Sequence, residues 1–380
     1  MLFGKAHFNQ KIDRSNTQSR KWNKYSDTDI LPFWIADMDF ASPSFILEAI
    51  QSRLEHPVMG YSDHEALLNS SFCRWLKVHH DWEIHSEWVI WIPGVVPGLN
   101  ISALLLNKVA SIMVPTPVYP PFLEIGGNAG LDCINTPMKK DGLIWTFDFI
   151  QMEKDIRPET KMLFLCNPQN PTGRVFTMSE LSELADFVKT HNLLLVSDEI
   201  HCNIILNEQK RHLPIALHFP EIADQTISLY SAAKTYNIPG MRCAAAVIPN
   251  PELRERFKRT MRGIIPSVGP LESIASIAAF SDETNWIPAL NEYLAENASI
   301  LASSLGTRSQ IPEATYLAWI DISDLKLTNP EAYLDSFGLG ISPGELFGKN
   351  GYIRFNFACP REQLLSGLDR LNKALTSTRR

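Results

Sequence analysis

Residues 231–242 have the sequence Ser-Ala-Ala-Lys-Thr-Tyr-Asn-Ile-Pro-Gly-Met-Arg, in which Lys234 stands in a turn of small residues and Arg242 follows eight positions later. The apolar run before the turn, 226–230, predicts a buried strand, and 244–248 predict another. A lysine at the carboxyl end of such a strand points into the crevice where open α/β sheets bind ligands. There its amine can form a Schiff base with a carbonyl group. Because a solvated loop can carry the same Ser-x-x-Lys pattern, the interpretation depends on the rest of the chain.

The composition narrows the class of protein. Apolar residues make up 45% of the 380 positions and charged residues 20%, which is typical of a soluble globular chain long enough for a large and a small domain. The net charge of −7 argues against binding to nucleic acid. Six cysteines without ligand spacing predict reduced thiols, a cytoplasmic location and no metal site. We expect neither a signal peptide nor a membrane segment, because no suitable apolar run occurs.

Short apolar runs alternate with helical patterns through much of the chain. Helical spacing starts at Ser44, after Pro43. The runs are apolar almost throughout, as in sheets covered on both faces, so the alternation predicts a mostly parallel α/β sheet. The predicted strands are 88–92, 111–114, 132–136, 161–166, 193–197, 226–230 and 242–248, with a helix at 179–190.

The pattern changes near Asp282. A long helix, strands at 316–322 and 352–357 and a final helix from Arg361 predict a smaller α+β domain. The polar N-terminal arm is assigned to the same domain. The predicted parts are an arm at 1–43, a large domain at 44–281 and the remainder of the small domain at 282–380.

Three further predicted strand ends carry reactive or ligand-binding groups. Asn170 lies in an Asn-Pro-rich turn after 161–166, and Asp198 ends the strand at 193–197. Gly94 lies where a strand gives way to a helix whose backbone N–H groups can bind a phosphate. A turn, a helix N-cap or a plain connection explains each feature alone. Together with Lys234 they form one arrangement at successive strand ends.

This arrangement resembles the fold-type I pyridoxal-phosphate enzymes of the aminotransferase class I/II superfamily. More narrowly, the chain is similar to the cystathionine β-lyase or carbon–sulfur lyase branch typified by MalY and PatB. The resemblance spans nearly the whole chain and implies pyridoxal 5′-phosphate as the cofactor. The segments that carry it are 33–40, 60–62, 93–97, 115–122, 166–173, 197–201, 234–240, 315–319 and 354–361.

The resemblance implies a role for each site residue. Lys234 would hold the cofactor and remove the substrate's Cα proton, while Asp198 would pair with the pyridine nitrogen. Tyr119 would stack on the ring and take part in catalysis, and Arg354 would bind the substrate α-carboxylate. Asn170 would contact the ring's 3′-oxygen and the substrate.

The remaining predicted contacts concern the phosphate and the edge of the cofactor site. Tyr61 would reach substrate and the phosphate of a neighbouring subunit, which implies a homodimer with shared active sites. The other predicted cofactor-binding residues are Gly94, Val95, Val96, Ser231, Arg242 and His201.

Two features depart from the pattern of the lyase branch. Arg242 occupies a position where aminotransferases carry a phosphate-binding arginine and many carbon–sulfur lyases do not. The segment 100–114 is shorter than usual, so we expect a tight connection between helix and strand. His201, in Asp-Glu-Ile-His, is similar to the lyase branch.

The expected reaction is α,β-elimination of L-cysteine conjugates or cystathionine to a thiol, pyruvate and ammonia. One enzyme alternative is an aminotransferase, and another is a specialised biosynthetic pyridoxal-phosphate enzyme acting on a different amino acid. A regulatory binding protein on the same fold is the non-enzyme alternative, against which the presence of Lys234, Asp198, Asn170 and Arg354 argues.

Overall fold

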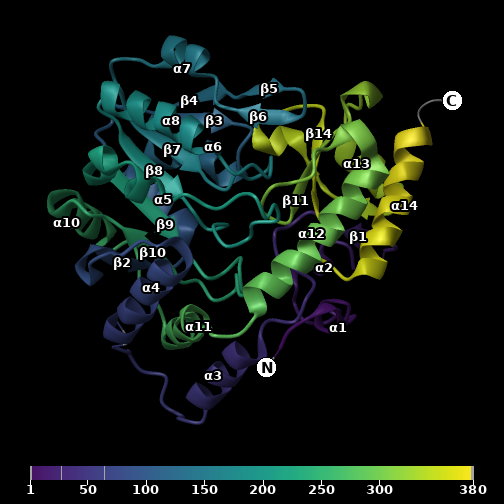
Figure 1. Ribbon diagram of the computed structural model, residues 1–380, viewed down its shortest axis with the longest axis horizontal. Helices are drawn as coiled ribbons and strands as arrows, with labels where there is room; N and C mark the ends of the chain where they lie inside the picture. The colour runs from purple at the N-terminus through teal and green to yellow at the C-terminus, as the bar shows by residue number, and fades with distance from the viewer. Residues whose placement is uncertain (1, 27, 64, 378–380) are drawn as a thin grey trace.

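The computed structural model describes residues 2–26, 28–63 and 65–377, and its largest feature is a seven-stranded sheet (Figure 1). The strand order is β2-β10-β9-β8-β7-β3-β4, and β10 runs in the direction opposite to that of the other six strands. The predicted mostly parallel α/β sheet is therefore confirmed. The strands are β2 Val89–Ile92, β3 Ser111–Thr116, β4 Asp132–Pro137, β7 Thr160–Cys166, β8 Leu194–Asp198, β9 Thr226–Tyr230 and β10 Ala244–Val247.

Each central strand is covered on both faces, which explains its continuous apolar sequence. In β7, Phe164 packs into one apolar cluster, while Leu163 and Leu165 pack into another. The first cluster includes side chains of α5 Val95–Ala103, α6 Pro120–Ala129 and α10 Pro251–Met261. The second includes α7 Phe149–Asp155 and α8 Met178–Thr190.

A smaller antiparallel sheet lies to the right in Figure 1, beside the long helices α12 Trp286–Leu305 and α14 Arg361–Ser377. Its strands are β11 Leu317–Asp321, β14 Tyr352–Asn356 and β13 Ser342–Pro343.

The N-terminal arm joins this C-terminal region, because β1 Leu31–Pro32 pairs in parallel with β12 Leu339–Gly340. Phe33 stacks on Phe355 with ring centroids 4.2 Å apart. The domain boundaries 1–43, 44–281 and 282–380 stay a prediction.

Several elements were not predicted, including α4 and the β5–β6 hairpin. Residues 104–110 connect α5 to β3. The remaining elements are α1 Lys5–Phe8, α2 Arg20–Asn23, α3 Ser44–Leu54, α4 Glu65–His80, β5 Lys139–Asp141, β6 Ile144–Thr146, α9 Ile215–His218, α11 Pro270–Phe280 and α13 Pro330–Asp335, with short 3₁₀ turns at Ser86–Trp88, Pro220–Gln225, Gly306–Arg308, Ser323–Leu325 and Gly344–Phe347.

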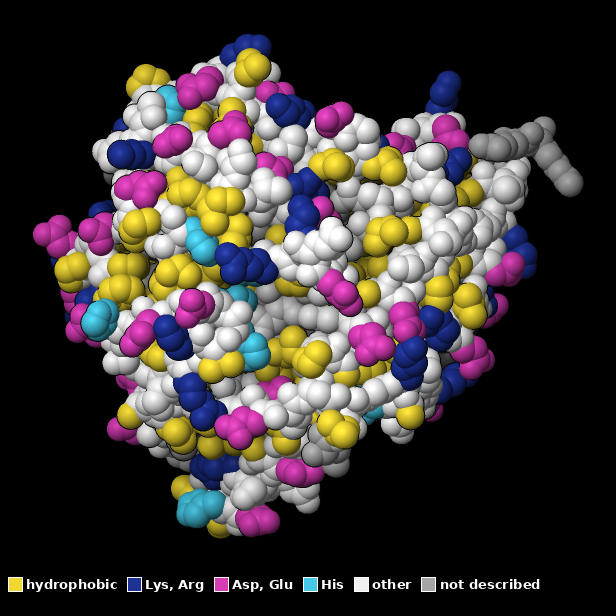
Figure 2. Space-filling model, in the orientation of Figure 1, with side chains coloured by type: hydrophobic (Ala, Val, Ile, Leu, Met, Phe, Trp, Pro, Cys, Tyr) yellow, Lys and Arg dark blue, Asp and Glu magenta, His cyan; other side chains and the backbone are white. Residues whose placement is uncertain are grey.

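Figure 2 shows histidine and basic side chains near the middle of one face of the molecule. A cavity of about 610 Å³ is lined by His79, His80, His212 and His218, among others. In the described part of the chain, no three His, Cys, Asp or Glu side chains are grouped to hold a metal ion. Within the same residues, none of the helices combines the length and apolar character needed to span a bilayer.

Candidate active site

The predicted site residues come from the loops at one edge of the large sheet. Asp198 ends β8, Asn170 follows β7, and Lys234 lies in the connection between β9 and β10. The carboxyl ends of β7, β8 and β9 lie at the same edge because these strands are parallel. Arg354 reaches the site from β14 of the smaller sheet. The site therefore lies where the two sheets meet.

The Lys234 amine forms a hydrogen bond with a backbone carbonyl. Its Nζ donates to the carbonyl oxygen of Ala36 at 2.5 Å. Burial, together with the nearby charge of Arg354, lowers the pKa of Lys234 to about 8, against the opposing effect of Asp37 and Asp198. This shift increases the neutral, nucleophilic fraction of the amine near neutral pH.

Asp198 is buried at the end of β8. Its Oδ1 accepts a hydrogen bond from the N–H of Ile200 at 3.1 Å. Burial raises the pKa of Asp198 to about 7, although the hydrogen bond from Ile200 and the charge of Lys234 oppose the shift. Among the described residues, no cation lies within 4.0 Å of this carboxylate. The carboxylate therefore retains capacity for a cationic or N–H group of a ligand.

Arg354 is also buried, and its hydrogen-bond partners are neutral. Its Nη1 donates to Oδ1 of Asn170 at 3.1 Å and its Nη2 to the carbonyl oxygen of Trp34 at 2.7 Å. The guanidinium lies 4.7 Å from the ring centroid of Phe347, and its Nε has no partner among the described residues. Burial lowers the pKa of Arg354 to about 10. A guanidinium in this setting is suited to binding a carboxylate.

His201 and Tyr119 lie within the electrostatic reach of these groups. Burial, reinforced by the charges of Lys234 and Arg354, holds the pKa of His201 well below its usual value, so the ring is neutral. Its centroid lies 5.8 Å from that of Tyr316. Burial also raises the pKa of Tyr119, although the nearby charge of Arg354 acts to lower it.

The first of the predicted phosphate contacts is Gly94, which directly precedes α5 and has a φ of +112°. A side chain is strained at this φ, so glycine suits the turn. The first N–H groups of α5, at Val95 and Val96, have no partners within the helix. Ser231 is buried, and its Oγ donates to the carbonyl of Cys243 at 2.6 Å.

Two predicted residues lie outside this buried group. Arg242 is exposed, and Tyr61 is fully exposed in the segment between α3 and α4. The single chain therefore does not bring either side chain into contact with Lys234 or Asp198. Their roles at the phosphate, like those of the other site residues, stay predictions.

The sequence analysis missed the contribution of backbone carbonyls. Ala36 accepts hydrogen bonds from both Lys234 and the hydroxyl of Tyr316, the latter at 2.9 Å. The segment 33–40 is one of those that carry the resemblance, but a carbonyl contact has no side-chain signature. Asp37, close enough to affect the pKa of Lys234, was missed for a related reason, because it lies far from Lys234 in sequence.

The site thus combines a buried amine, carboxylate and guanidinium at one edge of an α/β sheet. It can present a nucleophile to a carbonyl carbon and opposite charges to a zwitterionic ligand. This is the class of site found in lysine-dependent enzymes of amino-acid chemistry.

Comparison with known proteins gives the family. The sequence profile described as aminotransferase class I and II matches residues 28–371, and the chain belongs to this family. Cystathionine beta-lyase PatB of Bacillus subtilis (strain 168) is 31% identical over 388 residues, covering 97% of this chain and 100% of PatB.

Two solved structures extend the comparison. The crystal structure of OvoB has a TM-score of 0.94 and 38% identity, and the match covers 97% of this chain and 99% of OvoB. The PLP-bound C-S lyase from Staphylococcus hominis has a TM-score of 0.90 and 30% identity, covering 97% of this chain and 98% of the lyase. The fold-type I assignment and the resemblance to the lyase branch are confirmed.

Proposed function

We propose that the protein is a pyridoxal-phosphate-dependent carbon–sulfur β-lyase that releases a thiol from L-cystathionine or another L-cysteine conjugate. The observation that carries this proposal is the convergence of Lys234, Asp198 and Arg354 in one buried site. Full-length relatives named as a cystathionine beta-lyase and a C-S lyase support the reaction class.

The residues fit pyridoxal phosphate. Lys234 offers an amine to the aldehyde, and Asp198 a carboxylate to the ring nitrogen. The start of α5 offers N–H groups to the phosphate. Nδ1 of His201 and Nε of Arg354 are buried polar atoms without partners among the described residues. Such atoms are costly unless a ligand or water pairs with them.

When bound, the cofactor supplies an aldehyde for the substrate amine and a ring that takes up electrons from Cα. Arg354 binds the α-carboxylate, and Asn170 supports that guanidinium through its Oδ1. Lys234 then takes the Cα proton at Nζ, while Asp198 holds a proton at the ring nitrogen. Tyr119 would cover the ring. Cleavage of the Cα–H and Cβ–S bonds releases a thiolate and an enamine acid, which water converts to pyruvate and ammonia.

The active assembly we propose is a cytoplasmic homodimer with shared sites. Val58, Met59 and Tyr61 are exposed on one segment, and exposed apolar groups of this kind suit an interface. Tyr61 would then reach the phosphate bound by the other subunit, where Ser231 and Arg242 are further phosphate contacts.

The decisive experiment uses cofactor-loaded protein with L-cystathionine or S-methyl-L-cysteine and no keto acid. Equal amounts of thiol and pyruvate, formed over many turnovers, are the expected result. Turnover that requires an added keto acid and releases no thiol would instead identify an aminotransferase. Binding without either reaction would identify a regulatory protein and overturn the proposal.

A further inference from the structure

Two backbone carbonyls hold the two cationic side chains of the site. The carbonyl of Ala36 accepts from Nζ of Lys234, and the carbonyl of Trp34 accepts from Nη2 of Arg354. Both belong to residues 34–39, which we call the strap. The position of the strap therefore affects the amine and the guanidinium together.

The strap is joined to the elements that carry those side chains. From β14, Nδ2 of Asn356 donates to the carbonyls of Ile35 and Asp37, each at 2.7 Å. From the connection that carries Lys234, Asn237 accepts from the N–H of Met38 at 2.9 Å and donates to its carbonyl at 3.1 Å. These amides link the strap to both halves of the site.

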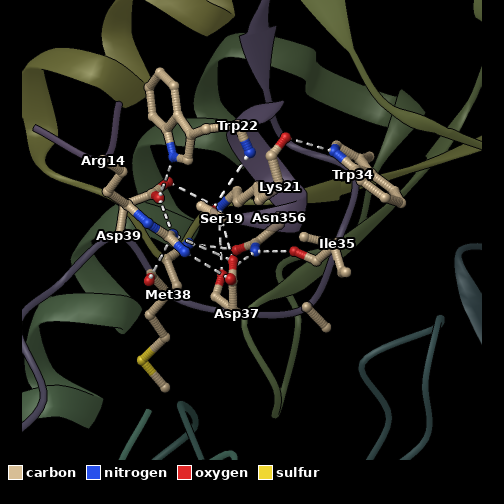
Figure 3. Close-up of polar contacts among 12 residues, drawn as sticks. Arg14, Ser19, Lys21, Trp22, Trp34, Ile35, Asp37, Met38, Asp39 and Asn356 are labelled. Carbon is tan, nitrogen blue, oxygen red and sulfur yellow. Dashed lines mark hydrogen bonds and ion pairs between the residues drawn. The ribbon is translucent and has the colours of Figure 1, made fainter. Parts of the chain in front are cut away.

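The N-terminal arm is also joined to the strap, by ion pairs and hydrogen bonds to Asp37 and Asp39 (Figure 3). Arg14 donates to Asp37 at 2.8 Å and to Asp39 at 2.6 Å. Lys21, whose side chain is fully buried, lies 2.8 Å from Asp39 and donates to the carbonyl of Asp37 at 3.2 Å. Nε1 of Trp22 donates to Asp39 at 2.9 Å.

The charges in this cluster balance, with two cations facing two carboxylates. Burial would raise the pKa of Asp39, but the charge of Lys21 and the hydrogen bonds from Lys21 and Trp22 outweigh that effect and lower it. Removing the charges of such a cluster from water is costly. Apolar side chains of similar volume often stabilise a fold as much as a buried charge cluster does. The cluster differs from apolar packing in fixing the direction of the strap, since each charge has a defined partner.

We propose that Arg14 and Lys21 are positioning residues that act through Asp37 and Asp39 to hold the strap carbonyls against Lys234 and Arg354. The inference rests on the proposed function and deepens it, because it assigns to the N-terminal arm a role in binding the amino-acid part of the substrate. Arg14 and Lys21 themselves touch no reacting atom.

The test replaces Arg14 by Gln, which removes the charge from a partly exposed side chain, and uses Lys11→Gln as the matched control. Lys11 is exposed on the same arm and outside the cluster. For S-methyl-L-cysteine, we expect the KM of Arg14→Gln to rise about tenfold, the scale of one hydrogen bond to a charged group. We expect kcat to change less than about twofold, because the reacting groups are intact.

A second readout does not depend on turnover. Arg354 lowers the pKa of Lys234, whereas Asp37 and Asp198 raise it. Without Arg14, the charge of Asp37 is less neutralised, so the pH midpoint for reaction of the apoprotein with added pyridoxal phosphate should move upward from about 8. The absorbance of the bound cofactor measures that midpoint, and Lys11→Gln should not change it.

A double variant tests whether Arg14 acts through its partner. In Arg14→Gln/Asp37→Asn, the midpoint should return toward the wild-type value. If Arg14→Gln and Lys11→Gln give the same KM and the same midpoint, the proposal is wrong. It is also wrong if the double variant keeps the full upward shift. Failure of the proposed function is distinct, because wild-type protein would then release no thiol while the midpoint could still be measured.

Discussion

Replacing Lys234 by Met should stabilise the cofactor-free protein while abolishing its reaction with pyridoxal phosphate. The amine lies in a setting that disfavours its charge, because burial and the neighbouring Arg354 both lower its pKa. Methionine has similar length and no charge. The substitution therefore removes an electrostatic cost that the apoprotein bears for its function.

The magnitude follows from the pKa of Lys234, which falls from 10.5 to about 8. At about 1.36 kcal/mol per pH unit, the cost approaches about 3 kcal/mol below pH 8. Since the side chain keeps partial solvent contact, we expect a gain of about 2 kcal/mol. Between about pH 8 and 10.5 the unfolded chain binds more protons than the native one, so wild-type stability rises with pH. The advantage of methionine should shrink in that window.

Urea unfolding of the two apoproteins at pH 7 and pH 9.5 measures this difference. As a control, Lys189→Met changes an exposed lysine on α8, so its effect should stay within about 0.5 kcal/mol at both pH values. Equal or lower stability of Lys234→Met at pH 7 would refute the reasoning. So would a gain that is as large at pH 9.5 as at pH 7.

Three further outcomes are expected. Asp198→Asn should stabilise the apoprotein by about 4 kcal/mol at pH 8 and by almost nothing near pH 3.8, since the native carboxyl has a pKa of about 7; urea unfolding across this range checks the sign. Arg354→Lys should raise the KM for amino-acid substrates about tenfold or more, because lysine cannot form the two-pronged contact with a carboxylate; steady-state kinetics with matched cofactor loading tests it. Gly367→Ala should cost about 1–3 kcal/mol, because its Cβ would clash with the Phe33 ring; thermal unfolding measures this loss, and an unchanged Tm would contradict it.

The sequence predicted the large sheet well because its strands are buried on both faces. Met113, Leu163 and Leu195 pack into one cluster, while Val114 and Phe164 face the other. This arrangement leaves an apolar run that marks each strand. An apolar run does not, however, indicate whether a strand is parallel or antiparallel to its neighbours, since an antiparallel strand such as β10 can be equally apolar. Topology then depends on the connection, which the apolar pattern does not encode.

The proposed site was predictable where a side chain ends a strand, as with Asp198, or lies in the turn that follows one, as with Lys234. It was not predictable where the contact is a carbonyl, as with Ala36, because every residue has one. Tyr61 and Arg242 are a different case. Both are exposed on the single chain, so their predicted contacts depend on a ligand or a second subunit rather than on local folding.

The three central charges of the site share one physical property. The pKa values of Lys234 and Arg354 are lowered and that of Asp198 is raised, so each group is displaced toward its neutral form. A cluster evolved for stability would pair these charges with one another, as Arg14 and Asp39 are paired nearby. Because Lys234, Asp198 and Arg354 are not paired with one another, they can instead form ion pairs with the charges of a bound ligand. Binding such a ligand should therefore relieve the cost that Lys234→Met removes by mutation, so that the two stabilising effects are alternatives rather than additive.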